Sequence, residues 1–316
     1  MKAFVTGGSG FVGKSLIRYL LSRGHAVVAL SRTEQSDSII QQIDANIQIV
    51  RGDLSSIAST HVESCDVVFH LAAQVNPRAP LAEMQRNNVD GTRLVIEAAK
   101  AADVPRFVLL STCSVYVKKD HAPLVNVKED DNVDPPEWAV YAYTKKLAED
   151  VVVAANIAVS LKLLLDTVWG PGLVNAVKNG ALRRFEPSGY SINTTHIENL
   201  CEGLLLSAEK GRPGNAYNIV DSDKVVFEEF VEQYVHAQDS SLHMPNNSIS
   251  FDTMYNILWL LEWIPFASSL LPVNREILVF AGQEYTVNSH KARQELGYVG
   301  HISREEGLEK VRRYRT

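Results

Sequence analysis

The feature that most constrains the fold is a glycine-rich segment directly after the first apolar run of the chain. The apolar run 3–5 is typical of a buried strand, and Gly7, Gly10 and Gly13 follow it at intervals of three residues, before an amphipathic helix. Such a turn needs one glycine at positive φ, one where a pyrophosphate approaches, and one where helix and strand pack closely. The helix N-terminus then offers free N–H groups to phosphates. We therefore predict a dinucleotide site lined by Gly7, Ser9, Gly10, Phe11, Val12 and Gly13.

Strand-like and helix-like segments alternate through the first half of the chain, which is typical of a parallel sheet covered on both faces. We expect strands at 26–30, 47–50, 67–71, 106–111 and 160–168, and helices at 88–101 and 141–155. The pattern loosens after Gly170-Pro171-Gly172. The sequence therefore predicts an α/β fold, a Rossmann-type doubly wound parallel sheet with a smaller C-terminal substrate-binding lobe. Residues 1–169 form the predicted dinucleotide-binding domain, and 170–316 mainly the lobe, with segments returning to the sheet.

The end of the second predicted strand indicates which dinucleotide binds. An acidic residue there would accept the ribose hydroxyls of NAD, but this chain has Ser31-Arg32-Thr33. A hydroxyl and a guanidinium suit the additional phosphate of NADP, so NADP is our preferred prediction. Stacking of Arg32 on adenine would suit either cofactor, and NAD therefore stays open.

Two further segments are predicted to contact the cofactor. Asp53 and Leu54 follow the third strand, where a carboxylate can bond adenine, although Asp53 could equally be an ordinary turn residue. Small residues after the fourth strand let a cofactor lie close to the backbone, and the contacts predicted there are Leu71, Ala72 and Ala73. The preceding His70 is expected to be a buried structural residue.

A second motif can transfer a proton. Tyr141 and Lys145 are four residues apart in a predicted helix and therefore share one face. An ammonium beside a phenol favours phenolate and lowers its pKa, and it can also bond the nicotinamide ribose. The other nearby tyrosine, Tyr143, has Leu147 four residues later, so it cannot be paired with an ammonium in this way. Hydroxyl groups that could complete the site occur in the segment 111–114, Ser-Thr-Cys-Ser.

The bulk composition limits the possible partners and locations. The chain has 316 residues, is 46% hydrophobic and carries a net charge of −6 without long runs of one sign, so nucleic acid is not expected to bind. Its three cysteines are too few and too scattered for a disulfide framework or a metal site. We expect a cytoplasmic protein without a signal peptide. The most apolar later stretch, 257–271, is interrupted by Glu262 and Pro265 and is too short to span a membrane. The segment 254–272 around it could pack the lobe's core or form a lid, a membrane-surface patch or a dimer contact.

Several motifs occur together in one order. They are the segments 6–13, 52–54, 70–73, 88–92, 111–116, 141–149, 168–172 and 289–298. In this combination the chain resembles the extended short-chain dehydrogenase/reductase family, also described as the NAD-dependent epimerase/dehydratase family. It is most similar to the 3β-hydroxysteroid dehydrogenase-like branch.

The resemblance implies roles for individual residues. Tyr141 corresponds to the family's acid/base, with Lys145 as the partner that adjusts its pKa. Thr112 corresponds to the catalytic hydroxyl, because it lies four residues before the tyrosine of Val115-Tyr116. Asn88 corresponds to a residue that supports the lysine through water, and Val168 belongs to a motif at the cofactor site. The family often forms homodimers through the two helices that begin here near Asn88 and Tyr141.

Departures from the family's patterns narrow the predicted reaction. The acidic pair that follows the catalytic threonine in sugar-nucleotide dehydratases is Cys113-Ser114 here, and the predicted strand before Gly170-Pro171-Gly172 lacks the Arg-Pro pair of many epimerases. The segment 196–199 is more similar to the 3β-hydroxysteroid dehydrogenase branch than to the sugar epimerases. We predict an oxidoreductase that interconverts a secondary alcohol and a ketone on a hydrophobic or sterol-like small molecule. The alternatives are a sugar-nucleotide epimerase with tightly bound NAD, and a non-catalytic dinucleotide sensor, which would not need Thr112, Tyr141 and Lys145 together.

Overall fold

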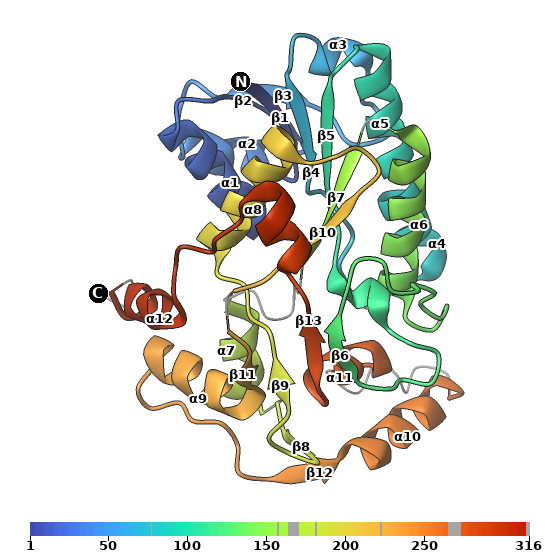
Figure 1. The fold of residues 1–316 in the computed structure, drawn as a ribbon, viewed down its shortest axis with the longest axis vertical. Helices are drawn as coiled ribbons and strands as arrows, with labels where there is room; N and C mark the ends of the chain where they lie inside the picture. Colours follow the sequence, from blue (N-terminus) through green and yellow to red (C-terminus); the bar gives the residue numbers. More distant parts are fainter. Residues whose placement is uncertain are drawn as a thin grey trace.

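A seven-stranded parallel sheet forms the larger part of the molecule (Figure 1). The computed structural model describes residues 1–76, 78–156, 158–163, 171–180, 182–221, 223–264 and 273–313. The strand order is β10-β7-β5-β4-β1-β2-β3, and every neighbouring pair is parallel. The strands are β1 (Lys2–Thr6), β2 (Ala26–Ser31), β3 (Gln48–Arg51), β4 (Val67–His70), β5 (Arg106–Leu110), β7 (Ala158–Leu163) and β10 (Ala216–Ile219). The predicted doubly wound α/β fold is confirmed.

The sheet is covered by helices on both faces (Figure 1). One apolar cluster joins it to α1 (Phe11–Ser22), α2 (Glu34–Gln41) and α8 (Ile197–Lys210). A separate cluster on the other face joins it to α3 (Ser59–Val62), α5 (Gly91–Ala101) and α6 (Val140–Ala155). Two short segments, α4 (Leu81–Met84) and the π-helical turn η1 (Gln85–Asp90), precede α5. The winding changes direction at β1, which lies between β2 and β4. Ligands of such sheets bind at this point, beyond the carboxyl ends of the strands.

The second half of the chain forms most of a smaller lobe beyond those carboxyl ends (Figure 1). Its mixed sheet has the order β11-β9-β13-β6, and a two-stranded sheet pairs β12 with β8. These strands are β6 (Leu124–Val127), β8 (Arg184–Glu186), β9 (Ser191–Ile192), β11 (Val225–Val226), β12 (Ser248–Ser250) and β13 (Tyr285–Val287). Its helices are α7 (Pro171–Lys178), α9 (Phe227–Gln238), α10 (Phe251–Glu262), α11 (Arg275–Ala281) and α12 (Arg304–Arg313). None of the described helices is long and apolar enough to cross a membrane.

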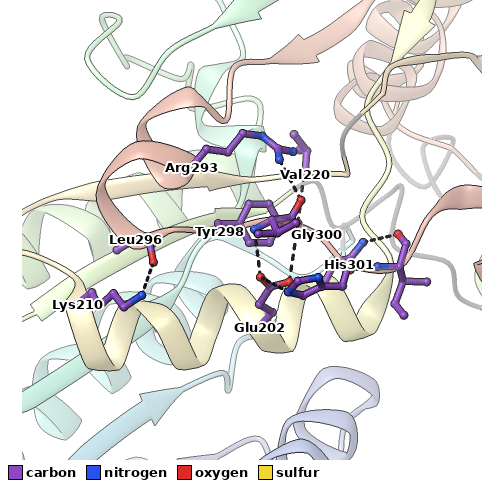
Figure 2. A network of polar contacts seen from close by, with 11 residues as sticks. Glu202, Lys210, Val220, Arg293, Leu296, Tyr298, Gly300 and His301 are labelled. Carbon is purple, nitrogen blue, oxygen red and sulfur yellow. Dashed lines mark hydrogen bonds and ion pairs between the residues drawn. The ribbon is translucent and has the colours of Figure 1, made fainter.

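Segments from the second half also return to the large sheet, as Figure 2 shows for the end of the chain. The short π-helical turn η5 (Ala292–Leu296) lies against α8, and Lys210 of α8 donates a hydrogen bond to the Leu296 carbonyl. Tyr298 is buried and donates to the Val220 carbonyl just after β10. Glu202 accepts from the amides of residues 299 and 300. These contacts fix the predicted 289–298 motif to the sheet, while a boundary at residue 169 lies outside the described residues.

Candidate active site

The glycine loop is closely packed against its neighbours. The Gly10 amide donates to the Gly7 carbonyl, 3.0 Å away. A Cβ atom added to Gly13 would lie 2.1 Å from that same carbonyl oxygen, so no side chain fits there. Gly7 has a φ of +71°, and a Cβ on it would lie 2.9 Å from the Ala72 amide nitrogen. The loop therefore keeps open a side-chain-free cradle at the start of α1, which fits a pyrophosphate.

The loop after β4 is held against β1 by a buried polar network. Thr6 accepts hydrogen bonds from the amides of Leu71 and Ala72. Its hydroxyl also lies 2.8 Å from Nδ1 of His70, whose Nε2 lies 3.0 Å from the hydroxyl of Thr92. Burial and the charge of Lys145 lower the pKa of His70 to about 3, so the ring is neutral. His70 is thus the buried residue that the sequence predicts, and it bonds the same Thr6 hydroxyl that accepts from the amides of Leu71 and Ala72.

The predicted adenosine end of the site lies at the ends of β2 and β3. Ser31 is buried, Arg32 is exposed, and Thr33 caps α2 by accepting from the Ser36 amide. Ser9 of the glycine loop donates to the Ser36 hydroxyl, 3.4 Å away, which brings the starts of α1 and α2 together. These hydroxyl groups and the exposed Arg32 guanidinium share one corner of the sheet.

Asp53 stabilises a turn after β3, which is one of the two roles that the sequence allowed for it. Its Oδ1 accepts from the amides of Ser55 and Ser56 and from the Ser55 hydroxyl. These hydrogen bonds, chiefly the one from the Ser55 hydroxyl, lower the pKa of the carboxyl group. Its contact with adenine stays a prediction. The neighbouring Leu54 packs on Gly91 at the start of α5.

Tyr141 and Lys145 lie one turn apart on α6, as predicted. The Tyr141 hydroxyl is buried, and the Lys145 ammonium is buried and donates to the Leu110 carbonyl at the end of β5, 2.8 Å away. Burial lowers the pKa of Lys145 to about 8, and the buried carboxyl of Glu149, one turn further along α6, opposes this shift. The lysine therefore keeps its charge at neutral pH.

The hydroxyl groups after β5 lie next to α6, because the turn η2 (Cys113–Tyr116) packs against that helix. The Thr112 hydroxyl caps η2 by accepting from the Ser114 amide, and it donates to the Ser114 hydroxyl, 2.8 Å away. The Ser111 hydroxyl is buried and has no hydrogen-bond partner among the described residues. Thr112 and Ser111 both remain able to serve a ligand, and the assignment of Thr112 stays a prediction.

Asn88 joins the cofactor side of the site to α6. Its side-chain amide exchanges hydrogen bonds with the backbone of Gln74 and donates to the hydroxyl of Thr144, the residue before Lys145. Asn88 therefore holds the loop after β4 and the α6 helix together. The predicted support of Lys145 through water stays a prediction, and Val168 lies outside the described residues.

Two residues at the site are absent from the sequence-based prediction. Glu276 of α11 accepts hydrogen bonds from the amides of Tyr141 and Ala142. The buried Tyr285 of β13 donates to the Cys113 carbonyl, next to Thr112. The smaller lobe thus holds both the tyrosine and the threonine segments. A signal for the first contact existed, because Ala139 at the N-cap of α6 has no side-chain acceptor of its own.

The comparisons with known proteins agree with this geometry. A model of the NAD dependent epimerase/dehydratase family matches residues 3–220, more than half of the chain. The chain belongs to this family. A relative from Stigmatella aurantiaca, 4-hydroxy-2-methyl-3-oxo-4-farnesyl-3,4-dihydroquinoline-1-oxide ketoreductase, is 34% identical, and the match covers 99% of this chain and 96% of the relative. The decarboxylating sterol-4-alpha-carboxylate 3-dehydrogenase of Dictyostelium discoideum is 25% identical over 98% of this chain and 99% of that protein.

Among solved structures, this member of the epimerase/dehydratase family is similar to DesIV, a dTDP-glucose 4,6-dehydratase from Streptomyces venezuelae crystallised with NAD and TYD bound. The TM-score is 0.75 at 20% identity, over 99% of this chain and 96% of that one, which shows a shared fold. The family and the oxidoreductases among the relatives confirm the predicted enzyme class. The protein is an NAD(P)-dependent dehydrogenase or reductase of the extended short-chain type.

Proposed function

We propose that this protein interconverts a secondary alcohol and a ketone on a hydrophobic, sterol-like or prenylated small molecule, with NADP(H) as a dissociable co-substrate. The observation that carries the proposal is the arrangement of Tyr141, Lys145 and Thr112 beyond the carboxyl ends of the sheet. A buried phenol, a buried ammonium on the same helix face, and a hydroxyl on the adjoining turn are the groups that carbonyl reduction requires.

A nicotinamide cofactor held on the glycine loop of Gly7, Gly10 and Gly13 would supply hydride for the reducing direction. Tyr141 transfers its phenolic proton to the carbonyl oxygen, and the Thr112 hydroxyl, released from Ser114, donates a hydrogen bond to the same oxygen. Lys145 stabilises the resulting phenolate through its charge, because its ammonium is fixed by the Leu110 carbonyl and is remote from bulk water. In the oxidising direction, Tyr141 removes the proton from the alcohol.

The surroundings of the site favour an apolar substrate over a nucleotide sugar. The two named relatives act on a farnesylated ring and on a sterol, according to their names. Two arginines of the smaller lobe, which would be candidates for binding a diphosphate, have protein partners: Arg184 donates to the Pro245 carbonyl, and Arg275 pairs with Glu262. Arg275 also lies over the ring of Trp138, three residues before Tyr141.

The apolar segment 254–272 has two kinds of side chain in its described part. Leu258 is buried, and Met254 and Tyr255 pack on the lobe's core, so the core-packing interpretation accounts for part of it. Trp259 and Trp263 lie edge to face and are 44% and 75% exposed. We propose that this exposed end of α10 contributes to apolar substrate capture; residues 265–272 lie outside the described part.

The preference for NADP rests on the corner formed by Ser31, Arg32 and Thr33. Arg32 is exposed at the end of β2, where the first acidic residue, Glu34, begins α2, and the Ser36 hydroxyl lies between those of Thr33 and Ser9. A 2′-phosphate would gain a charged partner and several donors there, whereas NAD would leave Arg32 without an anion.

We also propose a cytoplasmic homodimer. Helices α5 and α6 pack side by side on one face of the sheet, and Leu94 and Val153 on them are exposed apolar residues. Pairing of these helices with a second copy would cover both side chains. The three cysteines are all buried thiols, which suits a reducing compartment.

The test is an assay that measures NADPH consumption by the purified protein in the presence of a panel of carbonyl compounds. The panel contains a 3-ketosteroid, a prenylated cyclic ketone and a short aliphatic ketone, with dTDP-glucose and UDP-glucose as nucleotide-sugar controls. The proposal predicts NADPH consumption with a large apolar ketone and none with the nucleotide sugars, and loss of this activity in Tyr141→Phe. Conversion of a nucleotide sugar without net NADPH consumption would favour the epimerase alternative.

A further inference from the structure

The helix that carries Tyr141 and Lys145 has no cap of its own. Its N-cap residue is Ala139, whose side chain cannot accept a hydrogen bond, and no local side chain takes its place. The first amides of a helix have no partner within the helix, and they are usually satisfied by a serine, threonine, aspartate or asparagine at the N-cap. In α6 these first amides include that of Tyr141 itself.

The acceptor for these amides comes from the smaller lobe, about 135 residues later in the chain. Oε2 of Glu276 lies 3.2 Å from the Tyr141 amide nitrogen, and Oε1 lies 2.8 Å from that of Ala142. The Glu276 side chain is buried, with 4% of its surface exposed. A carboxylate at this end of a helix also interacts favourably with the helix dipole. One side chain therefore engages the backbone of the proposed acid/base residue with both of its oxygens.

The residue before Glu276 connects the same short helix, α11, to α10. Arg275 is buried, donates through Nε to Glu262 at the end of α10, and donates through Nη1 to the hydroxyl of Tyr255 on α10. Its guanidinium carbon lies 4.6 Å from the ring centroid of Trp138, which precedes α6. Consecutive residues of α11 thus contact α10 on one side and the start of α6 on the other.

We propose that Glu276 is a positioning residue for Tyr141, which fixes the first turn of α6 from the smaller lobe and so holds the phenol beside Thr112. The inference rests on the proposed function in one respect, namely that Tyr141 transfers the proton. Lys145 lies one turn deeper in α6 and is fixed separately by Leu110, so cofactor binding does not depend on Glu276. A displaced phenol lowers the rate of the chemical step and leaves the cofactor in place.

The experiment compares Glu276→Gln with the wild type in the ketone assay. The glutamine has nearly the same shape, but its amide nitrogen cannot accept the second hydrogen bond. We expect kcat to fall about tenfold or more, with KM for the ketone and Kd for NADPH within about twofold of the wild type. The kcat value is calculated per NADPH-binding site, measured by fluorescence titration, so that unfolded molecules are not counted. If Glu276→Gln binds no NADPH, Glu276→Asp is measured in the same way, with the same expected loss of kcat.

Asp221 provides a matched control at another helix. Its buried carboxylate accepts from the amide of His196 at the start of α8, from the hydroxyl of Thr194 and from the side chain of Asn199. Asp221→Asn should lower Tm as Glu276→Gln does, but should leave kcat per site unchanged. Equal losses of kcat in the two variants, or a kcat of Glu276→Gln within twofold of the wild type, would overturn the assignment. Full activity of Tyr141→Phe would instead refute the proposed function, so the two failures can be distinguished.

Discussion

Nζ of Lys145 donates a hydrogen bond to the carbonyl oxygen of Leu110, 2.8 Å away, at the point where β5 ends. This contact joins the helix of the predicted proton donor to the strand that leads into Thr112. It also keeps a charged group inside the protein, where burial lowers its pKa to about 8. Below that pH the ammonium retains its proton and can stabilise a phenolate on Tyr141.

Removal of the phenol tests the role of Tyr141. Tyr141→Phe should lower kcat by about 10²–10⁴-fold, because general acid–base catalysis contributes that much. The Kd for NADPH should stay within about twofold, since the ring and the helix are retained. Steady-state kinetics and a fluorescence titration measure both quantities. A variant with nearly full activity would show that another group transfers the proton.

Removal of the ammonium should change the pH dependence of alcohol oxidation. In Lys145→Met the phenol loses its charged neighbour and becomes harder to deprotonate, so the rising limb of kcat/KM should move to higher pH by about one unit or more. The measurement is a pH profile with a secondary alcohol and NADP⁺. An unshifted limb with a uniformly lower rate would mean that Lys145 acts on cofactor binding alone.

The candidate hydroxyl groups after β5 can be distinguished by substitution. Thr112→Val should lower kcat by about 10²-fold, as expected for the loss of a hydrogen bond made mainly in the transition state. Ser111→Ala and Ser114→Ala serve as matched controls and should stay within about threefold of the wild type. If Ser111→Ala lowers kcat more than Thr112→Val does, the buried hydroxyl of Ser111 is the functional group. The role that the resemblance gives to Thr112 would then be wrong.

The glycine cradle can be tested with two alanine substitutions. In Gly13→Ala the new Cβ would lie 2.1 Å from the Gly7 carbonyl oxygen, so the backbone of the loop must move. We expect NADPH affinity to fall by about 10²-fold, equivalent to about 2.7 kcal/mol of binding free energy. In Gly8→Ala the nearest atom is the end of the Ile17 side chain at 3.0 Å, which can adjust. Calorimetric titration should therefore show clearly tighter NADPH binding by Gly8→Ala than by Gly13→Ala, and equally weak binding by both variants would contradict this.

His70 should make the fold sensitive to acid. Its pKa is about 3 in the folded protein, against 6.5 for an ordinary histidine. Between these values the unfolded chain binds one proton more, so the free energy of unfolding falls as pH decreases, by up to about 1.4 kcal/mol per pH unit. His70→Gln, which can still bond Thr6 and Thr92, should lack this part of the slope. Urea unfolding of both proteins between pH 6.5 and pH 4.5 measures the difference, and parallel slopes would contradict a neutral His70.

The features that sequence could predict are those encoded over short distances. Strand, glycines and helix follow one another within 1–22, and the spacing of Tyr141 and Lys145 fixes their shared helix face. Strands β1, β2, β4 and β5 lie within one or two residues of their predicted positions. The short helix α2 escaped prediction because it is mostly polar; only Ile40 on it is buried, and its start depends on the cap formed by Thr33.

The rest depends on contacts between distant parts of the chain. In the smaller lobe, β13 pairs with β6, which lies about 160 residues earlier, and each strand has only three or four residues. No local pattern specifies such a pairing. The same reason hides Glu276: Ala139 signals that α6 needs an acceptor from elsewhere, but nothing local to α11 indicates that Glu276 supplies it. Sequence pattern alone also leaves Thr112 and Ser111 as alternatives, because both follow the same strand.

The identity of the dinucleotide released from the purified protein distinguishes a dissociable NADP(H) from a permanently bound NAD. The protein is denatured without added cofactor, and the supernatant is analysed by chromatography and mass spectrometry, alongside a titration of the native protein with NADPH and NADH. We predict less than stoichiometric dinucleotide, and tighter binding of NADPH than of NADH, a preference that is lost in Arg32→Ala. Stoichiometric NAD that survives purification would contradict this prediction, because such a cofactor is recycled in place, as the epimerase alternative requires.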